Sequence, residues 1–240
     1  MNGEYEARLA RLRGRMGMQG LDALVVLGAA DCRYLTGFTG EAASVTVTLN
    51  DCVLLTDPRF TVQASEQMKI GRPIIASNGR DEALLEVLGE ASLVAEAQRP
   101  MVGVESGHLS VRRWETLRSS LERSDLEWRL VSGVVEECRR VKFPGELQHM
   151  RESAALVTQA FAHLEGMSVI GRSEREVALE LEFFLRKNGS EGVAFPFIVA
   201  AGERAAMPHA EPSDVLIAHG DLLVVDIGAV VGGYASDMTR

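Results

Sequence analysis

Short apolar runs alternate with amphipathic segments along the first part of the chain. Apolar residues recur at steps of three and four over residues 3–19, which predicts a helix that Gly20 ends. Unbroken apolar runs predict buried strands, and segments with helical spacing separate several of them. The expected strands cover residues 21–27, 44–49, 52–56, 73–76, 101–104 and 127–131. Strands that alternate with helices in this way are typical of a layered α/β domain.

The pattern changes near residues 139–144, so the sequence predicts one domain over residues 1–138 and a second over 139–240. Pro144 suits the first turn of a helix. Apolar residues then recur at alternating steps of three and four, which indicates a long helix with one apolar stripe. The stripe consists of Leu147, Met150, Ala154, Val157, Phe161 and Leu164.

A second helix is predicted to begin at Ser173, which forms a capping box with Glu176. It ends near Asn188, and a strand is expected over residues 192–201. Two helices followed by strands predict an α+β domain in which the helices cover one face of a sheet.

The last stretch of the chain, LLVVDIGAVVGGYASDMTR, interrupts an apolar run with a carboxylate. Asp226 stands inside the run, glycines 232–233 allow a tight turn, and Asp237 follows on a second short strand. If the turn centres on Val231 and Gly232, the two aspartates lie opposite each other on one face of a hairpin, because strand side chains alternate.

Two carboxylates at such close range repel each other, and a carboxylate within a buried strand is costly unless it meets a cation or hydrogen-bond donors. A divalent metal ion resolves both problems, since carboxylate oxygens suit hard and borderline ions. Paired ions bridged by carboxylates can activate water for hydrolysis. The spacing also fits two solvated carboxylates beside a turn, so it leaves both readings open.

His209 follows Pro208 in a loop rich in turn-forming residues, between 202 and 214. An imidazole there can donate a hydrogen bond to a substrate carbonyl or to a tetrahedral intermediate. A histidine on an ordinary surface loop is the alternative. The other four histidines, at 108, 149, 163 and 219, have no comparable context.

Composition narrows the functional classes. The 240 residues carry a net charge of −9, which argues against a nucleic-acid partner because such a surface needs a basic face. No apolar stretch approaches the length that spans a membrane, and the N-terminus lacks the apolar core of a signal peptide. Three cysteines without metal spacing indicate buried thiols in a reducing cytoplasm.

Residues 1–138 show none of the phosphate-binding, nucleophile-elbow or zinc-peptidase motifs. The one loop punctuated by glycines is YLTGFTG, residues 34–40. It suits either a ligand loop or a plain turn that holds an aromatic ring against the sheet.

The segments FPFIVAAGERAAMPHAEPSD and GDLLVVDIGAVVGGYASDMTR resemble the first half of the catalytic domain of Xaa-Pro aminopeptidases and prolidases. Those enzymes are metallopeptidases with the pita-bread fold. The segments RLARLRGRMGMQGLDALVV, YLTGFTG and VLLTDPRF resemble the creatinase-type N-terminal domain, and VKFPGELQHMRESAALVTQAF resembles the first helix of the pita-bread domain. The resemblance implies an α/β N-terminal domain followed by an incomplete α+β pita-bread domain.

By this resemblance, Asp226 and Asp237 are the first two of five metal ligands, and His209 lines the active site without binding metal. The family commonly uses two Mn²⁺ ions, with Co²⁺ or Zn²⁺ as alternatives. The implied substrate is a peptide with proline at the second position. The N-terminal domain of the family serves dimerisation and substrate-length gating, which implies a homodimer.

The related enzymes continue with a histidine and two glutamate ligands that this sequence does not contain. We therefore expect a truncated product or fragment that is inactive by itself. A prolidase that cleaves dipeptides shares the same motifs. A non-catalytic binding or dimerisation protein on this fold is a further alternative, and both aspartates argue against a metal-free creatinase-type amidinohydrolase.

Overall fold

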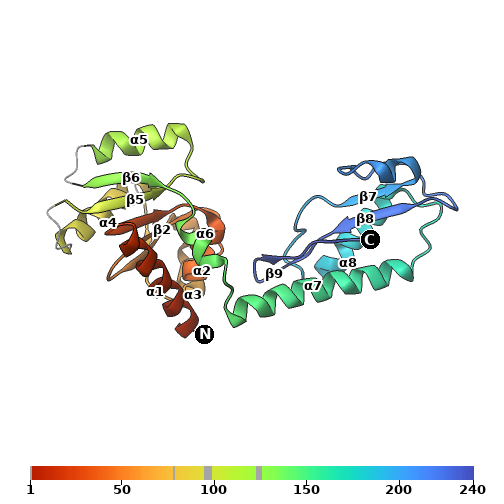
Figure 1. Ribbon diagram of the computed structural model, residues 1–240, viewed down its shortest axis with the longest axis horizontal. Helices are drawn as coiled ribbons and strands as arrows, with labels where there is room; N and C mark the ends of the chain where they lie inside the picture. Colours follow the sequence, from red (N-terminus) through yellow and green to blue (C-terminus); the bar gives the residue numbers. More distant parts are fainter. Residues whose placement is uncertain (1, 78, 95–98, 123–125) are drawn as a thin grey trace. The chain divides into compact units, whose positions relative to one another are not determined.

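The computed structural model describes residues 2–77, 79–94, 99–122 and 126–240 (Figure 1). The chain divides into two compact units, Met1–Val141 and Lys142–Arg240. The boundary that the sequence indicates, between residues 138 and 139, lies inside helix α6 (Val134–Arg139). Within the described residues, every helix is too short or too polar to cross a membrane.

The first unit is built on one six-stranded sheet with the strand order β4-β3-β2-β1-β5-β6. Strands β1, β2 and β3 pair antiparallel, whereas β4, β5 and β6 each run parallel to their inner neighbours. The strands are β1 (Ala23–Val26), β2 (Ala43–Thr48), β3 (Cys52–Thr56), β4 (Arg72–Ile75), β5 (Met101–Glu105) and β6 (Glu127–Val131). The sheet is therefore mixed, and the predicted α/β class is confirmed.

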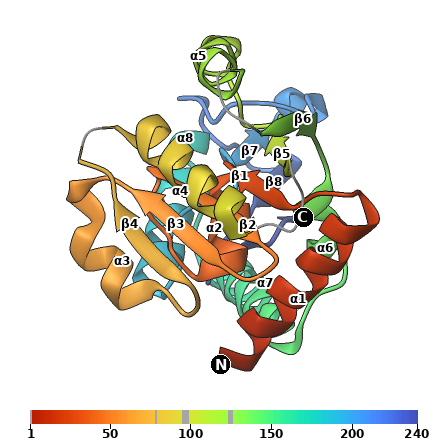
Figure 2. The same cartoon turned by 90° about the vertical axis from the view of Figure 1, so that its left-hand side faces the viewer.

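Helices cover both faces of this sheet, which explains why its central strands are unbroken apolar runs. In β1, Leu24 and Val26 pack with one set of helices, while Ala23 and Val25 pack with the other. Helices α1 and α6 lie side by side in the first set (Figures 1 and 2). The first set is α1 (Asn2–Met18), α2 (Ala29–Thr36), α3 (Thr61–Gln67) and α6, and the second is α4 (Arg80–Val94) and α5 (Val111–Leu121).

The segment expected to be a loop over residues 34–40 is in part the end of helix α2. Gly37 ends the helix in the left-handed conformation, with φ 83°, and its N–H donates to the Arg33 carbonyl. Tyr34 and Phe38 are 3% and 1% exposed, so both rings belong to the core. Of the two alternatives for residues 34–40, the structure therefore favours the turn that holds an aromatic ring against the sheet over the ligand loop.

The connections after β1 and β5 leave the sheet toward opposite faces. Strand β1 leads into α2, which belongs to the first set of helices, whereas β5 leads into α5, which belongs to the second set on the other face. The two strands are adjacent and parallel. Their carboxyl ends therefore form a topological switch point, where open α/β sheets commonly bind ligands.

The second unit packs two helices against a three-stranded antiparallel sheet with the order β11-β8-β7. The helices are α7 (Pro144–Glu165) and α8 (Glu174–Lys187). The strands are β7 (Ile198–Ala201), β8 (Leu223–Ile227) and β11 (Met238–Thr239), and the short pair β9 (Val230–Val231) and β10 (Tyr234–Ala235) completes the hairpin. The predicted capping box is confirmed, since Glu176 N–H donates to Ser173 Oγ at 3.2 Å.

Two expectations for this unit need correction. The apolar stripe of α7 is only partly right, because Leu147 and Met150 are 38% and 36% exposed. The buried face of the helix consists of Glu146, Ser153, Leu156, Val157, Ala160 and Phe161. The strand expected over residues 192–201 is confined to β7, and Val193 makes only an isolated bridge to Ala229. Pro196 lies between them and has no N–H for a sheet ladder.

Gly228 is required where the hairpin strands approach each other. A Cβ at this position would collide with the carbonyl oxygen of Ser236 and would lie 2.7 Å from the Ala194 Cβ. We expect Gly228→Ala to lower the free energy of unfolding of the second unit by about 1–3 kcal/mol, as overpacked cores do. Urea unfolding measures this change.

Gly192→Ala is the matched control, because the nearest atom to a Cβ there is 3.9 Å away. We expect it to change stability by less than about 0.5 kcal/mol. Equal effects of the two substitutions would contradict the close approach at Gly228.

Candidate functional site

The register of the last hairpin differs by one step from the expected one. The turn consists of Gly232 and Gly233, with φ of 59° and 80°, and not of Val231 and Gly232. A two-residue turn with two positive φ angles accepts glycine at both central positions, whereas a β-branched valine is disfavoured there. Consequently Asp226 lies opposite Thr239.

Asp226 and Asp237 are therefore diagonal neighbours instead of directly opposed residues. Asp237 lies two positions before Thr239, and alternation along a strand returns a side chain to the same face every second residue. Diagonal neighbours on one face are within reach of each other. The prediction of direct opposition is wrong, but the shared face follows from the observed register.

Asp226 projects away from the core of the second unit. Its neighbours Val225 and Ile227 are buried in the core cluster, so the alternation of β8 turns Asp226 to the other face. The side chain is half-buried, and its Oδ1 accepts a hydrogen bond of 2.8 Å from Thr239 Oγ1.

Asp237 is exposed, and no group in the described part of the chain donates to its carboxylate. Its position is fixed by the preceding residue. Ser236 Oγ accepts a hydrogen bond from Ala229 N–H at 3.2 Å. It also accepts a hydrogen bond from Ser153 Oγ of α7 at 2.8 Å. Helix α7 thus anchors the segment between β10 and β11, which carries Asp237 in place of the short strand expected from the sequence.

The other end of the hairpin is fixed to the first turns of α7. Tyr234 donates its hydroxyl to Glu146 Oε1 at 2.7 Å, while Glu146 Oε2 accepts from Phe143 N–H at 2.9 Å. The His149 ring stacks on Tyr234 with centroids 5.8 Å apart and fills the space where a Gly232 side chain would lie. The hairpin therefore cannot slide along the helix without breaking these contacts.

His209, Asp226 and Asp237 line one cavity of about 720 Å³. The sequence could place the two aspartates together, but it gave no distance to His209, which lies in the loop after β7. Apolar and polar side chains complete the wall, among them Arg175, Leu179, Glu182, Phe195, Pro196 and Phe197. All three candidate site residues from the sequence analysis therefore line the same cavity of the second unit.

A buried carboxylate that sequence reasoning missed holds the loop of His209. Glu174 is fully buried and accepts hydrogen bonds from Ala201 N–H at 2.9 Å and Ser213 Oγ at 2.7 Å. The Arg204 guanidinium donates to both of its oxygens at 3.1 Å. Both flanks of the loop are therefore tied to the first turn of α8. In the sequence Glu174 looks like an ordinary helix-starting acid, because nothing local indicates its partners.

Burial acts to raise the pKa of Glu174, but the hydrogen bonds from Ser213, Ala201 and Arg204 outweigh it and lower the pKa below its ordinary value. Glu174 is thus held as a carboxylate.

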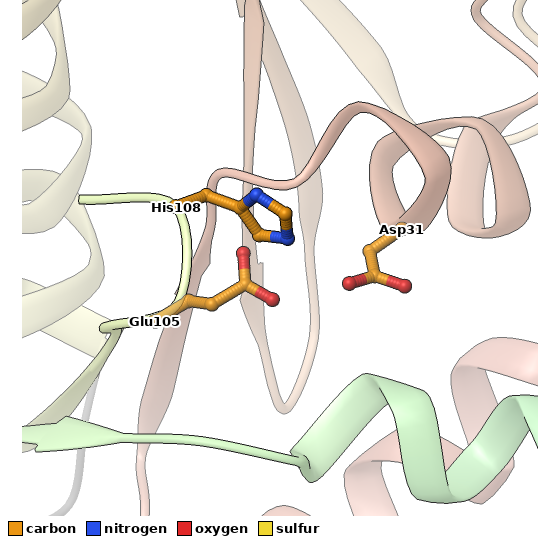
Figure 3. Close-up of side chains that lie close together, drawn as sticks. All are labelled: Asp31, Glu105 and His108. Carbon is orange, nitrogen blue, oxygen red and sulfur yellow. The ribbon is translucent and has the colours of Figure 1, made fainter. Parts of the chain in front are cut away.

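A second cluster lies in the first unit, where the sequence showed no chemistry. Asp31, Glu105 and His108 bring carboxylate and imidazole atoms within 4.8 Å of one another (Figure 3). They come from the first turn of α2, the last residue of β5 and the loop after β5. Burial raises the pKa of Glu105, and the Asp31 carboxylate adds to the rise, whereas N–H donors of Leu27 and Gly28 oppose it. Only the sheet topology brings these residues together, so no local motif could have indicated them.

We expect Glu174→Gln to destabilise the second unit by about 1–3 kcal/mol at neutral pH, because an amide satisfies fewer of these donors. The folded pKa of Glu174 lies below its ordinary value of 4.5. The contribution of the carboxylate is therefore complete above pH 4.5 and is lost as the pH falls through the folded pKa. Urea unfolding at a series of pH values tests this.

Glu203→Gln, an exposed change on the same loop, is the control and should leave stability unchanged. Hydrogen exchange of the Ala201 and Ser213 amides should accelerate only in the Glu174 variant. A stability difference that persists unchanged in acid would contradict the role of the ionised carboxylate.

Comparison with known families agrees with the division into two units. The sequence model of the creatinase/prolidase N-terminal domain family matches residues 8–141 of this chain. The sequence model of metallopeptidase family M24 matches residues 148–240. The first match covers more than half of the chain. The cavity with Asp226, Asp237 and His209 lies within the second match.

Individual relatives match over nearly the whole chain. The uncharacterized peptidase YqhT of Bacillus subtilis is 34% identical over 233 residues, which are 97% of this chain and 64% of the relative. The Xaa-Pro dipeptidase from Bacillus anthracis has a TM-score of 0.88 at 31% identity, over 98% of this chain and 64% of that one. The X-Pro aminopeptidase from Thermotoga maritima has a TM-score of 0.82 at 28% identity, and the match covers 95% of this chain and 64% of that one.

The chain thus spans less than two thirds of the length of these relatives. The predicted architecture is confirmed in both parts. The chain belongs to the creatinase/prolidase family, with the N-terminal domain of that family followed by part of the pita-bread fold of metallopeptidase family M24.

Proposed function

We propose that this chain carries part of the active site of a metal-dependent peptidase that releases the N-terminal residue from peptides with proline at the second position. The observation that supports the proposal is the convergence of Asp226, Asp237 and His209 on one cavity in the unit that matches the M24 family. Relatives with the names Xaa-Pro dipeptidase and X-Pro aminopeptidase support the substrate class.

The two aspartates fit a divalent metal by their chemistry. The Asp237 carboxylate has no donor among the described residues, and the Thr239 hydroxyl orients Asp226 through one oxygen. Oxygen donors of this kind suit Mn²⁺, the proposed ion, with Co²⁺ or Zn²⁺ as alternatives. When bound, such ions polarise a carbonyl and lower the pKa of water.

His209 is proposed to bind the substrate carbonyl or to stabilise the oxyanion of the tetrahedral intermediate. It is exposed on a loop whose two flanks are fixed by Glu174, so the imidazole can reach a ligand while its backbone stays in place. Phe195, Pro196 and Phe197 offer an apolar wall in the same cavity. Such a wall suits the ring of a proline residue.

Two carboxylates form an incomplete ligand set. In the described residues, neither aspartate belongs to a group of three or more candidate ligands within reach of one ion. We therefore propose that these 240 residues alone are inactive and that activity needs further donors. Prolidase activity on dipeptides is an alternative that the relatives support equally, and a homodimer and a cytoplasmic location stay predictions from the sequence.

A non-catalytic binding or dimerisation protein is the candidate from another class. The incomplete ligand set favours it, because a fold can keep two carboxylates after losing the chemistry. It predicts stable dimers and no metal binding at the cavity.

Metal binding at the cavity can be tested by Mn²⁺-induced broadening of amide NMR signals. We expect residues around Asp226 and Asp237 to broaden first, since a paramagnetic ion acts locally even when it binds weakly. Asp237→Asn should weaken this binding by at least about tenfold, because a change that merely reorients a ligand already costs that much. Asp221→Asn removes the same charge at a turn and should leave the broadening unchanged.

Activity can be tested with Xaa-Pro peptides of two, three and four residues in the presence of Mn²⁺. We expect no release of the N-terminal residue by the 240-residue chain. Turnover that Asp237→Ala abolishes would contradict this expectation and would mean that further ligands come from a partner chain. In a protein that supplies the remaining ligands, cleavage of tripeptides indicates an aminopeptidase, and cleavage of dipeptides alone indicates a prolidase.

A further inference from the structure

We infer that Asp31, Glu105 and His108 form a binding site for a first-row divalent transition-metal ion in the N-terminal unit. This site is separate from the cavity of Asp226 and Asp237, which belongs to the other unit. The inference rests on the place of the cluster in the sheet, the geometry of its donor atoms and the environment of its buried carboxylates.

The cluster lies at the switch point of the six-stranded sheet. Asp31 follows β1 and Glu105 ends β5, so the parallel neighbours place both carboxylates at the same edge. The chain then leaves toward opposite faces of the sheet through α2 and α5. Open α/β sheets commonly bind ligands at such a point. His108 lies on the second connection and is exposed, so it links the buried carboxylates to solvent.

The three side chains converge on one point from different directions (Figure 3). Their candidate ligand atoms all lie within 4.8 Å of one another. Ligand atoms around a tetrahedral Zn²⁺ are about 3.3 Å apart, so small side-chain rotations are enough to close the set.

Gly28 makes room for this convergence. A Cβ there would lie 2.8 Å from the His108 ring and 3.1 Å from Asp31 Oδ2. The absence of a side chain at position 28 therefore lets the imidazole approach the carboxylate.

One carboxylate oxygen in the cluster lacks a partner although it is buried. Glu105 is 4% exposed, and its Oε1 has no hydrogen bond in the described structure. Asp31 is 1% exposed and forms an ion pair of 2.6 Å with Arg139 through Oδ1. Among the described residues, an ion pair with a guanidinium is present at Asp31 and absent at Glu105. A buried acceptor without a donor is costly, and a cation between Glu105 Oε1, Asp31 Oδ2 and the imidazole removes that cost.

The remaining oxygens of the two carboxylates are already fixed. Glu105 Oε2 accepts from Leu27 N–H at 2.6 Å and from Gly28 N–H at 2.7 Å. Arg139 fixes Asp31 in the same way through the other oxygen of that group. Hydrogen bonds that orient ligands from behind are typical of metal sites and raise their affinity.

The donor set defines the class of ion. One imidazole with two carboxylates suits borderline ions such as Zn²⁺, Co²⁺, Fe²⁺ and Mn²⁺ better than Mg²⁺ or Ca²⁺, which prefer oxygen alone. Three protein donors leave one position open to water, and the exposed imidazole provides the path by which the ion enters.

The test is calorimetric titration of Zn²⁺ into the metal-free chain that carries Asp226→Asn and Asp237→Asn. These two substitutions remove the candidate metal ligands of the other cavity. We expect one Zn²⁺ per chain. Adding His108→Ala should weaken binding at least about tenfold, because it removes a ligand that is exposed and not needed for the core. Asp31→Asn should weaken binding likewise. Co²⁺ should give visible d–d absorption bands that His108→Ala alters.

His219→Ala is the matched control, since His219 is an exposed histidine of the other unit. It should leave both the affinity and the Co²⁺ spectrum unchanged. Absence of Zn²⁺ binding to the chain with Asp226→Asn and Asp237→Asn would overturn the inference. Zn²⁺ binding that His108→Ala leaves intact would also overturn it.

Discussion

The position of the Asp226 and Asp237 carboxylates depends on one constraint, the register of the last hairpin. Asp226 faces the cavity because Val225 and Ile227 are buried on the other face of β8. The pair of glycines in the turn then fixes which residues of the returning strand share that face. A slip of one residue would turn the whole strand over. Two carboxylates cannot set this arrangement themselves, since they repel each other. Apolar burial and turn geometry must hold them together before any cation binds.

Buried glutamates recur as the means by which distant segments are joined. Glu146 connects the start of α7 to the hairpin, and Glu174 connects the start of α8 to the loop of His209. Glu105 connects the end of β5 to the start of α2. Each accepts at least one hydrogen bond from a backbone N–H group that lies in another segment or just before its own helix. Glu105 differs from the other two because one of its oxygens stays without a partner.

The sequence predicted those features that depend on local patterns. The alternation of strands and helices, the capping box at Ser173 and the grouping of Asp226 with Asp237 all arise from residues close together in the chain. The errors have physical causes. The expected turn gave one central position to Val231, although both positions need a positive φ. Glu174 resembled a helix-starting acid because its partners lie 27 to 39 residues away. Periodicity does not report such distant contacts.

The two carboxylate clusters also differ in how completely their donors are organised. In the hairpin, one carboxylate is oriented by Thr239 and the other is exposed without a donor among the described residues. In the first unit, three donors of two chemical types already converge, and the outer oxygens of both carboxylates are fixed by N–H groups and by Arg139. A preorganised set loses little conformational freedom when it closes around an ion. Affinity should therefore follow the completeness of the donor set, so the unit without a recognisable motif is the better prepared of the two to bind a single metal ion.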